Sequence, residues 1–592
     1  MPTEAVKNRK FREIFHGATR FEIPFFQRGY AWEKKQWDQL FLDIREQILC
    51  DIQAGSTPED VEHFFGPIVV QEKSGSEQLK EYLVIDGQQR LTTIYLLLCV
   101  ISDSIHAKRH LSDAASGRVA EMKRYLVNDV IGGDDYLKLK IFSSKGDRLP
   151  TYRVVFGSEA NPRTPLLHTD QQLYLPGRNR VEDFQKYAMK RLRSEFPDVP
   201  SLIELSVAIL DCLTIVWIPL DAQKDDPQAI FESLNDKGMP LKASELLCNY
   251  LFRPIIASNL PFEDLHNDKW LGATHLLQSN EQFEECLRNL FSIGENKMVG
   301  KNRKVYIHFK NKNRSLTTGA AQQHLHDIYD ATRLYRSIVN PAASPHGDDS
   351  IHRTLINISN TRMESSIPFV LSVLQAQAND RLDICLARTI LRETLVLLVR
   401  RKMTEQSTTQ YDTMFPGLLA RIVNETRPIA ALHDQFQKNK VWVSDQDFVE
   451  ALISRPLYRP RDISFTKMVL VELDKQYQDF GQLPDYTTVG TIEHTLPQTP
   501  GEDWLEYIGD DRYDARLQIV TQTVGNLCLL SGPANSSAGR TPFERKAAGY
   551  SHVTALARSI KDFTGTWNIE GIQTRSRQLA EKATSIWAWS PD

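Results

Sequence analysis

The sequence predicts an α+β multidomain chain, with an α/β N-terminal domain, a helical middle region and a C-terminal domain of two strands, a loop and a helix. Its 592 residues are enough for about three or four domains. The apolar run at 213–220 indicates a late buried strand, whereas the apolar spacing from 228 to 478 is mainly helical. A turn-rich segment at 481–486 precedes the last domain. The expected domains are residues 1–225, 226–480 and 481–592.

A strand, a glycine and a helix N-terminus follow one another at Tyr82–Asp86, Gly87 and Gln88. This order aims backbone amides at phosphate oxygens. Arg90 on the first turn can add a two-pronged contact, and Thr92 or Thr93 a hydroxyl. Asp86 can supply a carboxylate to a phosphate-bound Mg²⁺. No Walker A sequence is present, so the segment is not a P-loop. Taken alone, each of these residues could be part of a helix cap or a salt bridge, which is the commoner origin of such residues.

Two further segments place polar residues within apolar surroundings. The aromatic residues of Ile23–Trp32 indicate core packing, but Gln27 and Arg28 interrupt the run. A guanidinium in such a run needs an anionic partner, and a phosphate and a structural carboxylate are both open. In Phe231–Leu241, a polar turn containing Asn235 separates two predicted helices.

Near the C-terminus, the carboxylate of Glu493 stands beside the imidazole of His494. A hard divalent cation prefers oxygen ligands, which Glu493 and the amide of Asn535 can supply. His494 can then accept a proton from the water that attacks a phosphodiester. Neighbouring strand residues point to opposite faces, so both can serve one site only where the strand twists or ends. Pro497 and Pro500 favour an early end.

The segments that follow set the predicted order of the C-terminal domain. Val524–Ser531 is typical of a second strand, and the Gly, Pro, Asn and Ser residues of 532–542 predict a loop. A helix is expected over Phe543–Tyr550, with Thr541 as its N-cap. The segment 567–587 predicts an amphipathic helix that packs on the core of this domain.

The motifs Glu-His-x-x-Pro-Gln at 493–498 and Asn-Leu-x-Leu-Leu-Ser at 526–531 resemble the ββα-metal (HNH) nuclease domain of GmrSD-like type IV restriction proteins, the part known as DUF1524. A Glu-His pair alone is usually a surface dipeptide, but the ordered set is specific. The resemblance implies a role for each of five residues: the general base His494, the metal ligands Glu493 and Asn535, the loop-holding Asn526 and the phosphate-contacting Lys546.

The segments 23–32, 86–90 and 231–241 resemble, in this order, the DUF262 domain that precedes the nuclease in such proteins. The resemblance implies a ParB-like α/β fold, completed by residues 231–255, that binds and hydrolyses a nucleoside triphosphate. ATP, GTP and other nucleotides are all open. The residues assigned to the nucleotide or its metal are Gln27, Arg28, Asp86, Gln88, Gln89, Arg90 and Asn235, and the phosphate argument above adds Gly87 and Thr92.

Both resemblances in one chain imply a nucleotide-regulated endonuclease that depends on Mg²⁺ or Mn²⁺ and cuts modified double-stranded phage DNA. Glycosylated or methylated hydroxymethylcytosine and backbone phosphorothioate are all open as the modification. A double-strand cut by one nuclease site per chain favours a homodimer. Two alternatives stay open: a nucleotide-sensing DNA-binding regulator or nickase, and a nuclease toxin acting on RNA or host DNA. The same metal and base hydrolyse any phosphodiester.

The net charge of −4 excludes a protein that wraps DNA over its whole surface, so a DNA contact must be local. The best candidate is 301–314, where six cations interleave with Tyr306 and Phe309, as backbone contact and base stacking require. A solvated loop is the alternative. A second cationic point, Arg400–Lys402, follows a predicted helix, where cations are favoured in any case.

No apolar run reaches the ~18 residues that a membrane span requires, and the first residues have no apolar signal core. A soluble cytoplasmic protein is therefore expected. The seven cysteines are scattered without a Cys-x-x-Cys pair, which predicts reduced core residues and no structural zinc.

Overall fold

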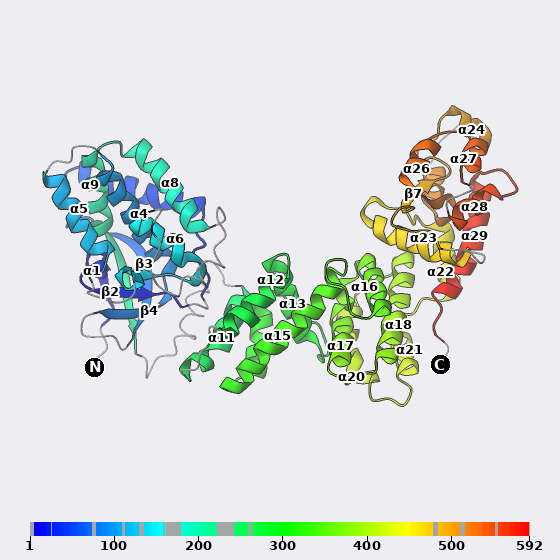
Figure 1. The fold of residues 1–592 in the computed structure, drawn as a ribbon, viewed down its shortest axis with the longest axis horizontal. Helices are drawn as coiled ribbons and strands as arrows, with labels where there is room; N and C mark the ends of the chain where they lie inside the picture. The colour runs from blue at the N-terminus through cyan, green and yellow to red at the C-terminus, as the bar shows by residue number, and fades with distance from the viewer. Residues whose placement is uncertain are drawn as a thin grey trace. The chain divides into compact units, whose positions relative to one another are not determined.

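The computed structural model divides the chain into two compact units, Met1–Pro254 and Ile255–Asp592 (Figure 1). The predicted middle region and C-terminal domain thus fall largely within one unit. The structure describes residues 5–24, 27–73, 79–108, 113–129, 135–157, 160, 179–221, 242–258, 262, 264–477, 483–509, 515–550 and 554–590.

A mixed sheet forms the centre of the first unit, with strand order β1-β6-β3-β4-β2-β5 among the described residues. β3 runs parallel to β6 and antiparallel to β4, β2 runs parallel to β4 and β5, and β1 runs antiparallel to β6. The strands predicted before Gly87 and at 213–220 are confirmed as β4 and β6. The bounds are β1 Lys7–Lys10, β2 Thr19–Glu22, β3 His63–Glu72, β4 Lys80–Asp86, β5 Ile141–Phe142 and β6 Leu213–Leu220.

The helix α4 lies in the core of the first unit. Every residue from Leu91 to Ser102 is buried, and a helix that is apolar all round belongs inside a core. Only Gly87 separates α4 from β4, so the buried helix starts next to the end of this strand. The helices of this unit are α1 Phe11–Phe15, α2 Lys34–Asp43, α3 Cys50–Gln53, α4 Gln88–His106, α5 Asp113–Leu126, α6 Lys145–Phe156, α8 Arg180–Glu195 and α9 Val199–Val207, with π-helical turns at Ile44–Leu49 and Ala208–Cys212.

The described residues from 242 to 477 form helices and turns without a strand, as the apolar spacing predicts. Several helices begin at a Ser, Thr or Asp whose side chain accepts a backbone amide of the first turn. The helices are α11 Ala243–Ala257, α12 Gly272–Leu276, α13 Asn280–Ser292, α14 Arg303–Lys312, α15 Thr318–Val339, α16 Asp349–Thr361, α17 Ile367–Ala378, α18 Ile384–Thr404, α19 Tyr411–Met414, α20 Leu418–Ile422, α21 Pro428–Lys438, α22 Asp445–Ser454 and α23 Ile463–Tyr477.

The basic segment 301–314 is largely helical, which corrects both predictions made for it. Val305, Tyr306 and Phe309 are buried on one face of α14, so apolar spacing outweighs the density of charge. Because both aromatic rings lie in the core, they cannot stack on nucleobases, and that expectation is wrong.

Two short strands and several helices form the C-terminal domain. The predicted loop 532–542 is wrong in its first half, where Ser531 caps the helix α26 by accepting the Ala534 amide. Thr541 is not the N-cap of α27, because Pro542 takes that position and the Thr541 hydroxyl donates to the Ala538 carbonyl. The elements are β7 Thr491–His494, β8 Leu527–Leu530, α24 Glu502–Ile508, α25 Ala515–Val520, α26 Gly532–Ala538, α27 Phe543–Ala548, α28 Ala555–Lys561 and α29 Ile569–Ile586.

The predicted C-terminal amphipathic helix is confirmed as α29, whose Ile572, Leu579 and Ala583 are fully buried. The same apolar core includes side chains of α18, α22 and α23, so the last helices of the middle region support the C-terminal domain. At Gly525, just before β8, an added Cβ would lie 2.2 Å from the Ile572 carbonyl oxygen and 2.3 Å from Ser576 Oγ. The backbone of this turn therefore lies directly against α29.

All seven cysteines are free, and five of them are buried. Cys50 and Cys385 are exposed, so the prediction of core residues is wrong for these two. In the described part of the chain, no helix has the length and apolarity needed to cross a bilayer.

Gly525→Ala is expected to lower the free energy of unfolding of the second unit by about 2 kcal/mol, because the new methyl group overlaps the backbone of α29. This corresponds to a fall of roughly 3 °C in the melting temperature measured by calorimetry. Gly532→Ala is the matched control, since its Cβ would meet nothing within 4 Å in α26. Equal melting temperatures for both variants would contradict the close approach.

Candidate functional site

The first candidate site lies where β4 ends and α4 begins. Gly87 joins them at φ 92°, a left-handed conformation that favours glycine. A Cβ atom there would lie 2.9 Å from the Pro67 carbonyl oxygen and 2.9 Å from the Ile68 side chain. The predicted strand, glycine and helix are confirmed. The first amides of a helix have no acceptor within it, so the start of α4 is favourable for an anion.

Two arginines and one carboxylate meet at this junction. Arg90 Nη1 donates to the Pro67 carbonyl at 3.0 Å and lies 4.0 Å from Asp86 Oδ2. Burial raises the pKa of Asp86, while the charges of Arg90 and Arg28 and a hydrogen bond from the Gly87 amide oppose the rise. The three charged residues predicted for the nucleotide site are therefore neighbours.

Two glutamine side chains beside these charges keep an acceptor unused. Gln27 Nε2 donates to the carbonyls of Val84 and Ile85 at 3.0 and 3.1 Å, which ties Gln27 to β4. Within the described residues, the buried Oε1 atoms of Gln27 and Gln88 have no hydrogen-bond partner, and neither has Nε of Arg28. Because buried polar atoms are normally paired, these three atoms fit a polar ligand held at the junction.

Two other residues predicted to contact the nucleotide are engaged or buried within the protein. Gln89 accepts the Ala31 amide at 2.7 Å and donates to the Gly29 carbonyl at 3.1 Å, so both ends of its amide are engaged. Thr92 is only 2% exposed within α4. Asn235 lies outside the described residues.

Asp147 is a residue of this site that the sequence analysis missed. Its carboxylate accepts the Tyr30 amide at 2.6 Å and the Asn179 amide group at 3.0 Å. Burial raises the pKa of Asp147, and these hydrogen bonds oppose the rise. Asp147 thus holds the loop that carries Arg28, from a position more than a hundred residues away where no motif marks it.

The second candidate site lies at the end of β7. Glu493 pairs with Cys528 of β8, and His494, the last residue of β7, pairs with Leu527. The strand therefore ends at the histidine, as Pro497 predicts.

Asn526 connects the two strands of this site to the loop between them. Its side chain, fully buried, accepts the Leu496 amide at 2.7 Å and the Trp567 indole N–H at 3.1 Å. It donates to the carbonyls of Leu496 and Thr521 at 2.9 and 2.8 Å. The Asn526 carbonyl also accepts the Thr495 amide at 3.0 Å. The chain that leaves His494 is thus hydrogen-bonded to one asparagine.

Lys546 of α27 contacts the last two residues of β7 and the residue that follows them. Its ammonium contacts Glu493 Oε1 at 2.6 Å and donates to the carbonyls of His494 and Thr495 at 2.7 and 3.1 Å. The Tyr550 hydroxyl donates to the same Glu493 oxygen at 3.1 Å. Burial raises the pKa of Glu493 and lowers that of Lys546, while their mutual attraction opposes both shifts. All three hydrogens of the ammonium have acceptors, so a phosphate contact would require Lys546 to leave them.

His494 is enclosed by three side chains from separate segments. Its Nε2 lies 3.0 Å from Gln522 Oε1, and Gln498 Nε2 lies 3.1 Å from Nε2 and 3.3 Å from Nδ1. The Tyr458 ring meets the imidazole edge to face, with centroids 4.6 Å apart. The Gln522 carbonyl also accepts the Tyr458 amide at 3.0 Å, so one residue positions both neighbours. Gln498 belongs to the quoted motif, but no sequence signal marks Gln522 or Tyr458.

Asn535 lies in α26 beside the same strand, and its Nδ2 donates to the Ile492 carbonyl at 3.1 Å. In the described chain, no group of three or more His, Cys, Asp or Glu residues is arranged to hold a metal ion. A Mg²⁺ ion needs only one or two protein oxygen ligands, because water and substrate phosphates supply the others. Glu493 Oε2 and Asn535 Oδ1 are hard donors on adjacent elements, so this pair fits a divalent ion.

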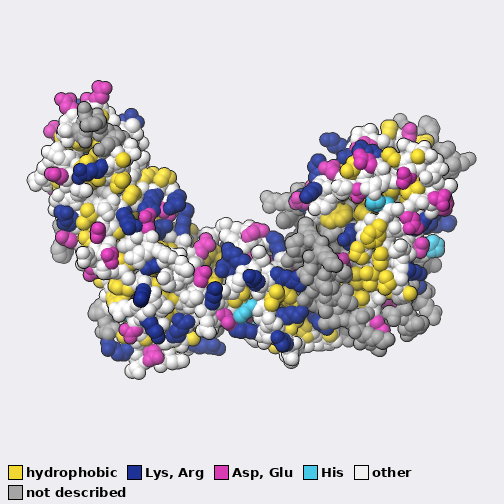
Figure 2. Space-filling view, turned by 180° about the vertical axis from the view of Figure 1, so that it is seen from behind, with side chains coloured by type: hydrophobic (Ala, Val, Ile, Leu, Met, Phe, Trp, Pro, Cys, Tyr) yellow, Lys and Arg dark blue, Asp and Glu magenta, His cyan; other side chains and the backbone are white. Residues whose placement is uncertain are grey.

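The two cationic segments differ in their surroundings. Lys301 pairs with Glu285 and Lys312 pairs with Glu295, which reduces the free charge of the first segment. Arg400 is buried and donates to the carbonyls of Trp587 and Val443, so it supports the fold. On the face shown in Figure 2, Lys and Arg side chains are interspersed with Asp and Glu.

Lys546→Met is expected to lower the free energy of unfolding of the second unit by about 3 kcal/mol, because the buried Glu493 carboxylate loses its counter-charge. The double variant Lys546→Met/Glu493→Gln should recover part of this loss, since it buries no charge. Chemical denaturation of the four proteins of this cycle measures the coupling. Strictly additive effects would show that the pair is not coupled.

Two family models match the chain, one over each region that contains a candidate site. Residues 11–252 match the family model described as the N-terminal domain of GmrSD restriction endonuclease. Residues 442–582 match the model described as the C-terminal domain of GmrSD restriction endonucleases. No curated protein matches the sequence. Both domains occur in the expected order and together span most of the chain, so the protein belongs to the GmrSD-like type IV restriction endonucleases.

Proposed function

We propose that this protein is a metal-dependent DNA endonuclease with an HNH-type site, in which His494 is the general base. A nucleoside triphosphate bound at the β4–α4 junction controls cleavage, and the substrate is modified double-stranded phage DNA. The observation that carries the proposal is the position of the His494 imidazole, which Gln522, Gln498 and Tyr458 hold at the end of β7 beside Glu493.

A general base must be unprotonated when it meets its water molecule. Burial, with the nearby Lys546 ammonium, lowers the pKa of His494 to about 4, so the ring is neutral at physiological pH. The Gln522 oxygen can only accept a hydrogen bond, which favours the tautomer with the proton on Nε2 and the lone pair on Nδ1, the nitrogen that the Gln498 amide meets at 3.3 Å. A water molecule that replaces the Gln498 amide at Nδ1 would meet the basic nitrogen.

Glu493 and His494 contact different elements, which suits an in-line displacement. The Glu493 carboxylate faces Lys546 and Tyr550, whereas the His494 imidazole contacts Tyr458 and Gln522. In-line hydrolysis needs the attacking and leaving oxygens on opposite sides of phosphorus. A phosphate at the end of β7 would have the base on one side and the carboxylate on the other.

The donor set supports a divalent metal beside Glu493. When bound, Mg²⁺ or Mn²⁺ would neutralise the phosphate and stabilise the leaving oxygen. Glu493 and Asn535 would hold the ion. Lys546 and Tyr550 restrain Glu493 Oε1 and so orient the carboxylate, as hydrogen-bonded neighbours of metal ligands do.

The unpaired polar atoms at the β4–α4 junction support a nucleotide site. Arg28 and Arg90 would pair with phosphate oxygens, and the first amides of α4 would add hydrogen bonds. Gln27 and Gln88 each offer a buried acceptor for a donor on the ligand. Asp86 is the available carboxylate for a phosphate-bound metal. Gln89 and Asp147 hold the loop that carries Arg28.

His494→Ala is expected to reduce DNA cleavage by at least about 100-fold, the contribution typical of a general base, and to leave nucleotide turnover unchanged. The assay compares unmodified, hydroxymethylated, glucosylated and phosphorothioated DNA with Mg²⁺ or Mn²⁺, with and without nucleotide. His326→Ala, a histidine of α15, is the control. Wild-type cleavage by His494→Ala would exclude this base. No cleavage of any DNA by the wild type, with nucleotide turnover intact, would favour a regulator or an RNA substrate.

Arg90→Ala is expected to slow nucleoside triphosphate hydrolysis at least about tenfold, because it removes a charge-assisted contact to phosphate. Phosphate release measures the rate, and Arg193→Ala, an exposed arginine of α8, is the control. Unchanged hydrolysis in a folded Arg90→Ala protein would assign Arg90 to structure, through its hydrogen bond to Pro67.

A further inference from the structure

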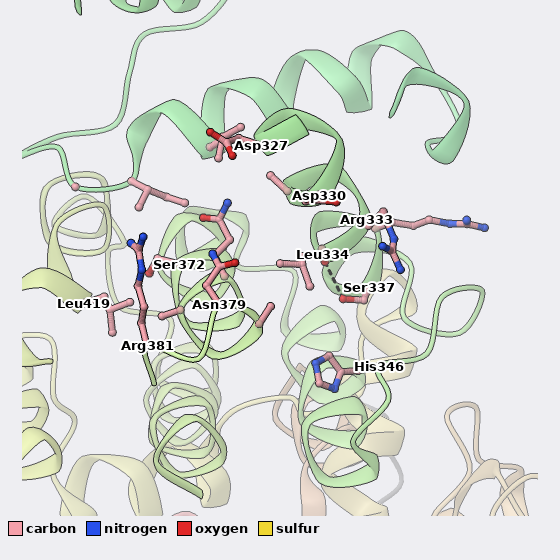
Figure 3. A pocket seen from close by; sticks show the side chains of 18 of the residues that line it. Asp327, Asp330, Arg333, Leu334, Ser337, His346, Ser372, Asn379, Arg381 and Leu419 are labelled. Carbon is pink, nitrogen blue, oxygen red and sulfur yellow. Dashed lines mark hydrogen bonds between the residues drawn. The ribbon is translucent and has the colours of Figure 1, made fainter. Parts of the chain in front are cut away.

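The helical part of the second unit contains a cavity of about 970 Å³. It is lined by residues of α12, α13, α15, α17 and α20 and by the loop after α15 (Figure 3). At its edge, the Gly294 amide donates to the Pro416 carbonyl at 2.8 Å, which ties two of the lining segments together. The cavity lies between the two family matches, so neither domain accounts for it.

Three arginines line this cavity. Arg333 and Arg336 lie one turn apart on α15, and Arg381 follows α17. In the continuous described stretch 264–477, none of the three forms an ion pair or a side-chain hydrogen bond. Figure 3 shows Arg381 and Arg333 on opposite sides of the cavity. Guanidinium groups placed in this way suit a ligand that carries at least two separated anionic groups.

The remaining lining is partly polar and partly apolar. The carboxylates of Asp327 and Asp330 reduce the positive charge, and Asp327 accepts the Gln323 amide group at 2.8 Å. Three arginines against two aspartates leave an excess of positive charge. Gln375 and Asn379 add amide groups. The apolar lining residues include Leu276, Leu290, Ile293, Leu334, Leu419 and Val423.

We propose that this cavity binds nucleoside phosphates, with phosphates on the arginines and the sugar or base against the aliphatic lining. The volume exceeds what a lone phosphate ion fills and lies within the range of cavities that hold organic ligands. Two sources share this chemistry: consecutive nucleotides of a DNA strand, and a free nucleoside triphosphate. Binding of a DNA strand in this cavity rests on the proposed nuclease function, whereas binding of a free nucleoside triphosphate does not.

The test measures binding to the full chain with EDTA present to prevent cleavage. One arm uses a fluorescein-labelled single-stranded oligodeoxynucleotide in fluorescence anisotropy, and the other uses ATP and GTP in titration calorimetry. Arg333→Ala and Arg381→Ala should each weaken binding about tenfold in one arm, by loss of a charge-assisted contact. Arg353→Ala, an exposed arginine of α16 that does not line the cavity, removes the same charge as the matched control.

Ala420→Trp gives an independent test, because it fills part of the cavity from an exposed position of α20 without changing the charge. Weaker oligonucleotide binding in the arginine and tryptophan variants would assign the cavity to a DNA strand. Loss of a triphosphate site would assign it to a free nucleotide. Wild-type affinity in both arms for all three variants would overturn the proposal. Cavity-dependent binding by a protein that cleaves no DNA would refute the proposed nuclease function alone.

Discussion

The hydrogen bonds of the buried Asn526 side chain are the constraint on which the proposed nuclease site depends. Two four-residue strands have little stability by themselves. Asn526 joins the start of β8 to both backbone groups of Leu496 and to the Trp567 indole, so the chain leaving His494 cannot move independently of β8. An amide is suited to this position because it donates and accepts at once, and each bond is made where water is excluded.

The C-terminal helix α29 adds to this support. Arg575 of α29 is buried and donates to the carbonyls of Gly525, Leu527 and Leu556, which flank or face the Asn526 turn. Burial lowers the pKa of Arg575, yet the carbonyl dipoles give the guanidinium acceptors in place of water. The geometry of the proposed base thus depends on a helix more than seventy residues further along the chain.

The two candidate sites differ in how completely their polar groups are paired. At the end of β7, Glu493, His494 and Lys546 all have partners within the protein. A substrate must therefore displace the Gln498 amide from His494. A ligand of the Glu493 carboxylate must compete with the Lys546 ammonium. At the β4–α4 junction, Gln27 and Gln88 keep buried acceptors without partners in the described structure. The first arrangement holds the proposed catalytic groups in place, and the second is suited to gaining a ligand.

Sequence alone determined the elements and residues whose signals are local. The strand before Gly87, the helix after it, the strand at 213–220 and the amphipathic helix at the C-terminus follow from turn chemistry and apolar period, which depend only on neighbouring residues. Tertiary structure decided what required distant partners. In the folded chain, 532–538 is a helix, Tyr306 and Phe309 are buried in the core, and the Lys546 ammonium pairs with the Glu493 carboxylate. Tertiary structure also surrounded His494 with side chains from three segments and formed the arginine-lined cavity. These contacts join residues far apart in the chain, and packing rather than local preference selects them.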